Sequence, residues 1–239
     1  MIKKPINQND SNDLELLNSI GYEYIFDNKP INRLKNKFVT QDLNQKSKLE
    51  KLNDLKKMIN SIENCKLKEK AKQIIFGDGN INSPLMIVGG APSEAEDSSG
   101  ATFFGEDGIL LKKMLIAINI NKDNIYSTYA INFKTPLDRK PNVEEITRYN
   151  TFLQKHISII NPKLIILFGS TAMESLMGSN NKISFERGKW KEIIINNTTY
   201  NTLITFDPSY LIRFPENKKH SWEDLKKIKQ KIIDLKLNI

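Results

Sequence analysis

Hydrophobic positions change their spacing along this chain, and the change divides it into two parts. Up to about residue 80, apolar residues recur at helical spacing among lysines and acids, which predicts helices at 12–21 and 45–62. From about residue 84, short continuous apolar runs alternate with helical patterns. Such runs are typical of strands buried on both faces of a parallel sheet. We therefore expect a helical N-terminal extension over 1–80 and an α/β domain over 81–239.

The alternation also predicts the elements of the second part. Apolar runs indicate strands at 85–88, 125–131, 163–169, 192–195 and 200–206. Helical spacing indicates helices at 108–118, 143–160, 170–177 and 221–237. This order predicts a three-layer α/β/α sandwich with a central, mainly parallel four-stranded sheet. Ligands of such folds bind at the carboxyl ends of the strands, so we expect the site in the loops 89–105, 129–141, 169–171 and 207–213.

Charge and composition narrow the function classes. The chain has 36 Lys and Arg against 28 Asp and Glu, a net charge of +8, which suits a polyanionic partner such as nucleic acid. Lys, Asn and Ile are frequent throughout the chain, however, which indicates a general compositional bias. The alternative is therefore that most lysines lie on solvated helix faces and bind no partner. No segment approaches the roughly 20 apolar residues of a membrane helix. The N-terminus has no apolar core typical of a secretion signal, so we expect a cytoplasmic protein that does not contact membranes.

Cysteine and histidine are too few for most metal sites. One cysteine, Cys65, excludes an internal disulfide and an all-cysteine metal site within one chain. The two histidines, His156 and His220, have no metal-ligand companion at close spacing. We therefore expect no bound metal and no cofactor.

Several segments follow a known pattern in the same order. The first is GGAPSEAEDSSGATFFGEDGILLKKML from Gly89, followed by NPKLIILFGSTAMESLMG, RGKW and DPSYLIR. Over residues 84–236 they resemble the motifs of the uracil-DNA glycosylase superfamily, and family 4 in particular. The resemblance implies a DNA N-glycosylase, a hydrolase of base excision repair that removes uracil or another damaged base. It implies uracil-containing or single-stranded DNA as the partner, and we expect a monomer.

A base pocket in this family needs a ring that stacks on the flipped base and backbone that approaches it closely. The resemblance gives the stacking role to Phe103 and places Gly89, Gly90, Ala91 and Tyr129 in the same pocket. The plain alternative is that the phenylalanine is an ordinary core residue, packed with the neighbouring phenylalanine.

Three positions depart from the family's pattern. Gly90 stands where the family has the carboxylate that acts on water, Tyr129 replaces the base-reading asparagine, and Asp207 replaces a histidine. A tyrosine donates one hydrogen bond and is large enough to fill a base pocket, whereas an ionised aspartate only accepts. Glu96 and Asp97 match the acidic pair that holds the pocket loop in the family. These two and the aspartate at 207 are the candidates for the catalytic carboxylate.

The family's four-cysteine iron–sulfur cluster aligns with Cys65, Lys68, Phe133 and Tyr149. One ligand of four is present, so we expect no cluster, and we expect the two aromatic residues to fill its volume.

The last motif also carries the expected contacts with DNA. Ser209 and Tyr210 lie in a segment that resembles the loop inserted at the duplex, and Arg213 and Lys219 follow it. Hydroxyl groups and cations of this kind hold phosphates, although solvated charge on the closing helix is an equal alternative for the lysine. The sequence leaves two main interpretations open: a divergent glycosylase, with retained or reduced activity, and a catalytically inactive DNA-binding member of the fold. A third, a structural or interaction protein that uses the amphipathic N-terminal helices, has no specific support in the sequence.

Overall fold

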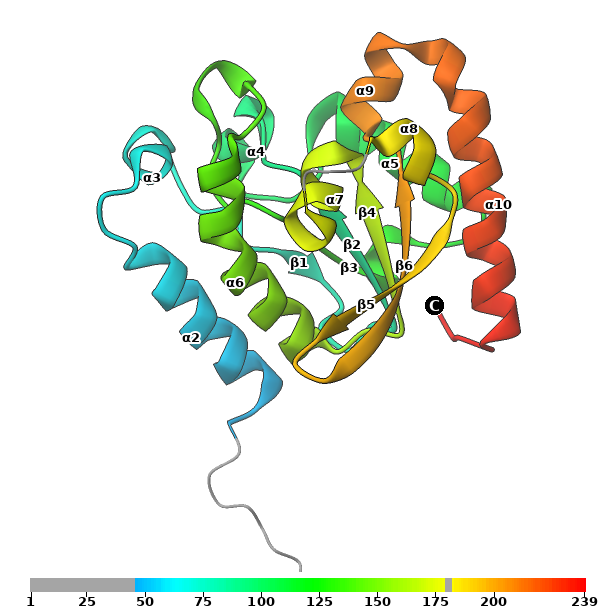
Figure 1. Cartoon of the computed structure of the whole chain (residues 1–239), viewed down its shortest axis with the longest axis horizontal. Coiled ribbons are helices and arrows are strands. Elements are labelled where there is room, and N and C mark those ends of the chain that lie inside the picture. The colour runs from blue at the N-terminus through cyan, green and yellow to red at the C-terminus, as the bar shows by residue number, and fades with distance from the viewer. Residues whose placement is uncertain (1–45, 179–181) are drawn as a thin grey trace, which may run out of the picture. The chain divides into compact units, whose positions relative to one another are not determined.

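The computed structural model describes residues 46–178 and 182–239, and the statements below concern these residues. They form one unit built on a six-stranded sheet with the strand order β1-β3-β2-β4-β6-β5 (Figure 1). The helix predicted at 12–21 lies outside the described residues. Within them, no helix has the length and apolar content needed to cross a membrane.

Four parallel strands form the centre of the sheet, as the apolar runs predicted. They are β3 (Tyr126–Tyr129), β2 (Leu85–Gly89), β4 (Leu164–Phe168) and β6 (Thr198–Thr205). Two antiparallel strands, β1 (Asp78–Gly79) and β5 (Trp190–Ile195), extend the sheet at its edges. The first has two residues, too few for a periodic pattern. Because the four central strands run the same way, their carboxyl ends meet at one edge of the sheet.

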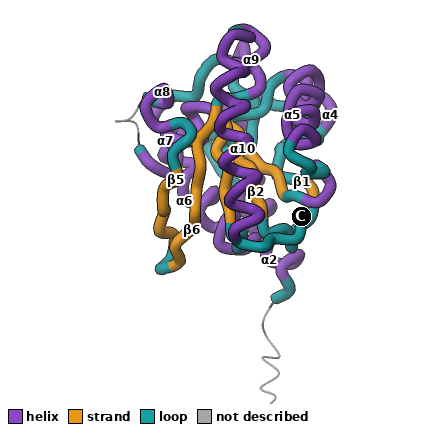
Figure 2. The backbone as a smooth tube through the Cα atoms, turned by 90° about the vertical axis from the view of Figure 1, so that its right-hand side faces the viewer, coloured by secondary structure: helices purple, strands orange, loops and turns teal. Residues whose placement is uncertain are grey.

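Helices cover both faces of the sheet, which confirms the three-layer sandwich (Figures 1 and 2). Alternate residues of β2 separate the two cores: Met86 and Val88 face one, Leu85 and Ile87 the other. The first core also contains residues of α2 (Lys48–Asn60), α6 (Val143–Ile160) and α7 (Gly169–Met177). The second contains residues of α5 (Gly105–Ala117), α9 (Pro208–Arg213) and α10 (Lys218–Asp234).

All four long helices form, and α6 has its predicted bounds, because its ends carry clear signals. Helices α5 and α10 begin three residues before their predicted starts and have no side-chain cap there, and α2 is shorter than predicted at both ends. At the start of α6, Asn142 accepts a hydrogen bond from the backbone of Glu145, whose carboxylate accepts one in return. The helix ends at Asn161, which has left-handed backbone angles. Ser47 and Glu50 form the same reciprocal cap at the start of α2. Buried leucines of α2 join the first core, while the proposed division of the chain near residue 80 stays a prediction.

Short helices complete the fold, and most lie in loops at the edge where the strands end. None was expected from periodicity, because each has six residues or fewer. They are α3 (Lys66–Lys70), α4 (Glu94–Ser99), α8 (Ile183–Glu186), α9, and the 3-10 turns η1 (Lys122–Asn124), η2 (Pro136–Asp138) and η3 (Pro215–Asn217).

Candidate functional site

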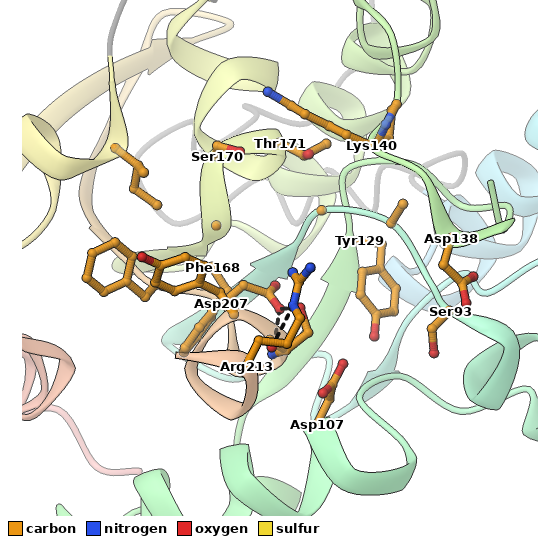
Figure 3. A pocket seen from close by; sticks show the side chains of 18 of the residues that line it. Ser93, Asp107, Tyr129, Asp138, Lys140, Phe168, Ser170, Thr171, Asp207 and Arg213 are labelled. Carbon is orange, nitrogen blue, oxygen red and sulfur yellow. Dashed lines mark hydrogen bonds between the residues drawn. The ribbon is translucent and has the colours of Figure 1, made fainter. Parts of the chain in front are cut away.

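A cavity of about 870 Å³ lies at the carboxyl ends of the central strands, where the alternation of strands and helices predicted a site. Its lining comes from segments far apart in the sequence: 90–96, 103–107, 129–141, 168–171 and 206–213, among others. Figure 3 shows side chains from these segments pointing toward a common space. The loops that the sequence singled out therefore form one site.

Glu96 ties together the two ends of the glycine-rich loop. Its side chain is 1% exposed, and one carboxylate oxygen accepts hydrogen bonds from the backbone N–H (2.9 Å) and the hydroxyl of Ser93. The other oxygen accepts from the backbone N–H of Phe104 at 3.0 Å. These contacts cap α4 and close the loop over the cavity, which Glu96 also lines. Three hydrogen bonds thus hold this carboxylate in place within the loop.

Asp97, the next residue on α4, is equally buried but does not line the cavity. Its two oxygens accept from the backbone N–H of Lys72, each at 3.0 Å, and one also accepts from Gln73 at 3.3 Å. Side chains of consecutive helical residues point about 100° apart. Glu96 therefore contacts the glycine-rich loop, whereas Asp97 contacts the segment that precedes β1. The structure does not bring Asp97 together with the other candidate carboxylates.

Phe103 and Tyr129 stack on each other inside the cavity. Their ring centroids are 5.0 Å apart at an angle of 30°, and the tyrosine hydroxyl accepts a hydrogen bond from the backbone N–H of Phe103 at 3.0 Å. Phe103 has φ +48, a left-handed angle, and its ring meets the edge of Phe168 at 6.1 Å. Phe104 is 52% exposed, so it does not share this packing. The tyrosine ring covers the face that the resemblance gives to a base.

Burial and the nearby Glu96 carboxylate raise the pKa of Tyr129 well above its usual value. The phenol therefore keeps its proton at neutral pH and can donate a hydrogen bond.

Gly89 and Gly90 are required by close packing. A β-carbon at Gly89 would lie 2.5 Å from the ring of Tyr129 and 2.9 Å from that of Phe103. At Gly90 it would lie 2.9 Å from Cβ of Thr171, on the first turn of α7. Gly90 and Ala91 line the cavity, whereas Gly89 lies beneath the stacked rings. A larger residue at 90 requires Thr171 to move.

Asp207 begins α9 at the opposite side of the cavity. One oxygen of its carboxylate accepts from the backbone N–H of Ser209 at 2.9 Å and from its hydroxyl at 2.6 Å. Burial raises the pKa of Asp207, and Glu96 adds to this, while the bonds from Ser209 and the charge of Arg213 oppose it. Proline at the first helical position supports this cap.

Asp107, which no sequence pattern marks as a site residue, also lines the cavity. It lies in the first turn of α5, and its carboxyl projects between Tyr129 and Arg213 (Figure 3). Burial raises the pKa of Asp107 to about 6, and repulsion from Asp207 and Glu96 adds to the shift. An acid in the first turn of a helix usually interacts favourably with the helix dipole. In the sequence, Asp107 is therefore indistinguishable from an acid that only stabilises the start of α5.

The residues expected to contact DNA lie at the mouth of the cavity, with one exception. Ser209, Tyr210 and Arg213 line it, and the tyrosine ring packs between Phe206 and Phe214 with both centroid distances at 4.9 Å. Lys219 is exposed on α10 and does not line the cavity.

The positions aligned with iron–sulfur ligands do not fit such a cluster. The Cys65 thiol lies 3.3 Å from the hydroxyl of Tyr149, whose buried ring meets that of Phe133 edge-on at 6.3 Å. Lys68 donates instead to backbone carbonyls, including that of Ile62 at 3.3 Å. Of the four aligned positions, three carry a lysine and two aromatic side chains, and one thiol cannot hold a cluster that needs four ligands. No group of three or more potential metal ligands occurs in 46–178 and 182–239.

Comparison with known proteins gives one consistent family. The model of the Uracil DNA glycosylase superfamily matches residues 76–226. The Type-4 uracil-DNA glycosylase of Sulfurisphaera tokodaii is 32% identical over 194 residues, covering 76% of this chain and 85% of that protein. The protein of the same name from Thermotoga maritima is 31% identical over 167 residues, covering 69% and 86%. That of Pyrobaculum aerophilum is 29% identical over 178 residues, covering 73% and 91%.

Proposed function

Because the chain belongs to the Uracil DNA glycosylase superfamily, we propose that it binds DNA and hydrolyses the bond between a damaged base, such as uracil, and its deoxyribose. The names of its relatives, Type-4 uracil-DNA glycosylases, support this reaction class. We propose that it acts on uracil-containing or single-stranded DNA in base excision repair, as a monomer in the cytoplasm.

One observation carries this proposal: a single cavity gathers Phe103, Tyr129 and Asp207, which stand at the positions of three separate family motifs. The cavity opens where the parallel strands end, and it combines an aromatic stack with carboxylates. A flipped base needs a ring to stack on, and a glycosidic bond that breaks needs negative charge near the sugar, which becomes cationic. The lining supplies both kinds of group.

The proposed roles follow from the hydrogen bonds of each residue. Glu96 holds the pocket loop closed through Ser93 and Phe104, and Asp97 anchors α4 from outside the cavity, so both position the site. Asp207 lies within the cavity and places its charge near the sugar. The hydroxyl of Ser209, the ring of Tyr210 and the guanidinium of Arg213 contact the DNA strand, with Lys219 farther along its path.

The ring of Tyr129 favours a second candidate function, a DNA-binding protein that does not excise a base. It stacks on Phe103 at 5.0 Å, where a base would stack, and it cannot present the paired donor and acceptor of an amide. Such a protein would keep the phosphate contacts at the mouth of the cavity and lose the reaction.

An excision assay separates the two candidates. An excess of protein is incubated with single-stranded and duplex oligonucleotides that contain uracil, hypoxanthine or xanthine, and alkali then cleaves abasic sites. The glycosylase proposal expects strand cleavage on at least one substrate. Salt-dependent binding with no cleavage on any of them over hours supports the second candidate and removes the first.

Two adjacent phenylalanines provide a matched pair of variants. Phe103→Leu keeps an apolar side chain in the cavity but removes the stacking face, and we expect it to slow excision by about tenfold or more. Phe104→Leu changes an exposed neighbour outside the cavity and should leave excision unchanged. Equal rates for the two variants would remove the stacking role.

A further inference from the structure

Asp107 is placed by the start of α5 so that its carboxyl enters the cavity. The helix begins at Gly105, and of the two acids that follow, Asp107 lines the cavity while Glu106 is exposed and does not. In Figure 3 the carboxyl points from the helix toward the space beneath Tyr129, with Asp207 and Arg213 to one side.

Hydrogen bonding sets this carboxylate apart from Glu96 and Asp207; the fourth carboxylate of the cavity, Asp138, also accepts no hydrogen bond from the described residues but is exposed to solvent on η2. Glu96 accepts from three donors and Asp207 from two, all within their own loops. No group in 46–178 and 182–239 donates a hydrogen bond to Asp107, and none forms an ion pair with it. Its oxygens are therefore available to a ligand or to water.

Charges around the cavity leave Asp107 without a close cation. Arg139 and Lys140, which line the cavity, are paired with Glu145 and Glu174 outside it, at 2.6 Å and 2.7 Å. Arg187 is paired in the same way with Asp224. Arg213 faces the acids but forms no ion pair within 4 Å in the described part of the chain. A positively charged group that enters would meet a carboxylate without an ion-pair partner in the described part of the chain, because Arg213 acts on it only from beyond 4 Å.

The environment of Asp107 also raises its pKa, so that its carboxylate accepts a proton more readily than an ordinary aspartate. Burial and the charges of Asp207 and Glu96 raise its pKa to about 6, so it is ionised at neutral pH and more basic than an ordinary aspartate. A general base works best when its pKa lies near the working pH.

We propose that Asp107 is the catalytic carboxylate that positions the attacking water, accepts its proton and stabilises the cationic sugar, a role for which position 90 has no side chain. The proposal rests on the glycosylase function proposed above. In this step the bond from C1′ to the base nitrogen breaks, and its electron pair leaves with the base. The water oxygen forms a bond to C1′, its proton passes to the Asp107 carboxylate and then to solvent, and the departing base takes a proton from solvent.

Single-turnover excision as a function of pH tests this role. The rate of the unmodified protein should rise with pH around 6 and then level off, because the ionised carboxylate is the active form. Asp107→Asn should lower the rate by roughly 10²- to 10⁴-fold and abolish that rise. Glu106→Gln, which removes the neighbouring exposed charge, should keep both rate and profile. A rate for Asp107→Asn within about threefold of the unmodified protein, with the rise near pH 6 intact, would overturn the proposal.

A second variant separates chemistry from folding. Asp107→Ala should regain activity when formate is added, because a small carboxylate can occupy the vacated space and accept the proton. Formate should not affect Glu106→Ala. Rescue is not expected if the aspartate only supports the helix.

A binding measurement tests the same carboxylate even if no base is released. DNA that carries a pyrrolidine in place of one deoxyribose mimics the cationic sugar, and DNA that carries a tetrahydrofuran is its neutral match. The unmodified protein should bind the pyrrolidine strand about tenfold more tightly, and Asp107→Asn should lose this preference. A preference that Asp107→Asn loses, without excision by the unmodified protein, removes the glycosylase function and the proton-accepting role and leaves Asp107 as the group that binds the cationic sugar. Equal binding of the two strands overturns the inference itself.

Discussion

Four carboxylates line the cavity; Asp138 is exposed to solvent, and the other three are each held by a different number of hydrogen-bond donors. Glu96 has three, Asp207 has two, and Asp107 has none within the described residues. A carboxylate that accepts from several donors is held in place, and fewer of its roughly four acceptor sites remain for a ligand. Glu96, with the most donors, therefore holds a loop, and Asp107, with none, is available to a ligand.

Replacing Asp107 with Asn should stabilise the protein at neutral pH. An acid whose pKa is raised in the folded state, here from 3.8 to about 6, favours folding below pH 4 and loses this contribution as pH rises through 6. Urea unfolding at pH 5 and pH 7 should give a larger free energy of unfolding for Asp107→Asn at pH 7, with a smaller difference at pH 5. Glu106→Gln is the control, and a lower stability for Asp107→Asn at pH 7 would contradict the buried-charge account.

Tyr129→Phe should destabilise the protein although it removes a single oxygen. The hydroxyl accepts from the buried backbone N–H of Phe103, which would be left without a partner in a left-handed conformation. We expect a loss of about 1–3 kcal/mol in the free energy of unfolding, measured in urea. Tyr149→Phe, which breaks a weak contact with the Cys65 thiol, should cost less. An equal loss for both would show that the N–H finds another acceptor.

Among the elements, the loop that carries η2 presents an apolar side chain to solvent at the mouth of the cavity. Leu137 is 99% exposed, and it and Asp138 have φ of +53 and +50. The turn is closed by the Thr135 hydroxyl, which donates to the carbonyl of Arg139 at 2.6 Å. Folding gains nothing from an exposed leucine in a left-handed conformation, whereas apolar side chains of this kind wedge between bases in DNA complexes.

Leu137→Gly is accordingly expected to weaken DNA binding without loss of stability. Glycine adopts left-handed angles freely, so thermal unfolding should occur at the same or a slightly higher temperature. Fluorescence anisotropy should give several-fold weaker binding to duplex DNA. Leu137→Asn is the matched variant, because asparagine also adopts left-handed angles and lacks the apolar side chain. Another exposed apolar residue, Ile109, is unsuitable for a glycine control because it lies inside α5. Unchanged binding by both variants would exclude a contact at this loop.

For the whole molecule, the net charge is +8, and both signs of charge line the cavity. Arg139, Lys140, Arg187 and Arg213 line it together with Glu96, Asp107, Asp138 and Asp207. A polyanion is attracted by the net charge and these cations and repelled by these acids, so we expect phosphates near the cations and an uncharged or cationic group near the acids.

Salt dependence measures the contacts of the cations with phosphates. Plots of log K against log salt concentration should be linear, and Arg213→Ala should reduce the slope by about 0.9 for duplex DNA, the value for one phosphate contact. Lys51→Ala, on α2 and outside the cavity, should leave the slope unchanged. Binding without salt dependence would contradict a contact with the phosphate backbone.

Sequence patterns were sufficient for the central strands and long helices, and insufficient for the site. Runs such as 163–169 are apolar on both faces of a strand, so they predict a buried parallel sheet without further information. The short helix α4 and the two-residue strand β1 leave no periodic trace. The stack of Tyr129 on Phe103 depends on tertiary packing over Gly89, and the role of Asp107 depends on which face of α5 turns toward the cavity.

In its stack on Phe103, the ring of Tyr129 occupies the position in the cavity that a flat ligand would take. This has a consequence for the rate of binding. A flat ligand that uses the same ring face binds only the fraction of molecules in which the tyrosine has swung away. If opening breaks one aromatic contact and one hydrogen bond, at about 2 kcal/mol together, roughly 3% of molecules are open. Apparent affinity is then about thirtyfold weaker than intrinsic affinity, and the loss falls on the association rate. This protein would sample many sites on DNA for each one that it engages.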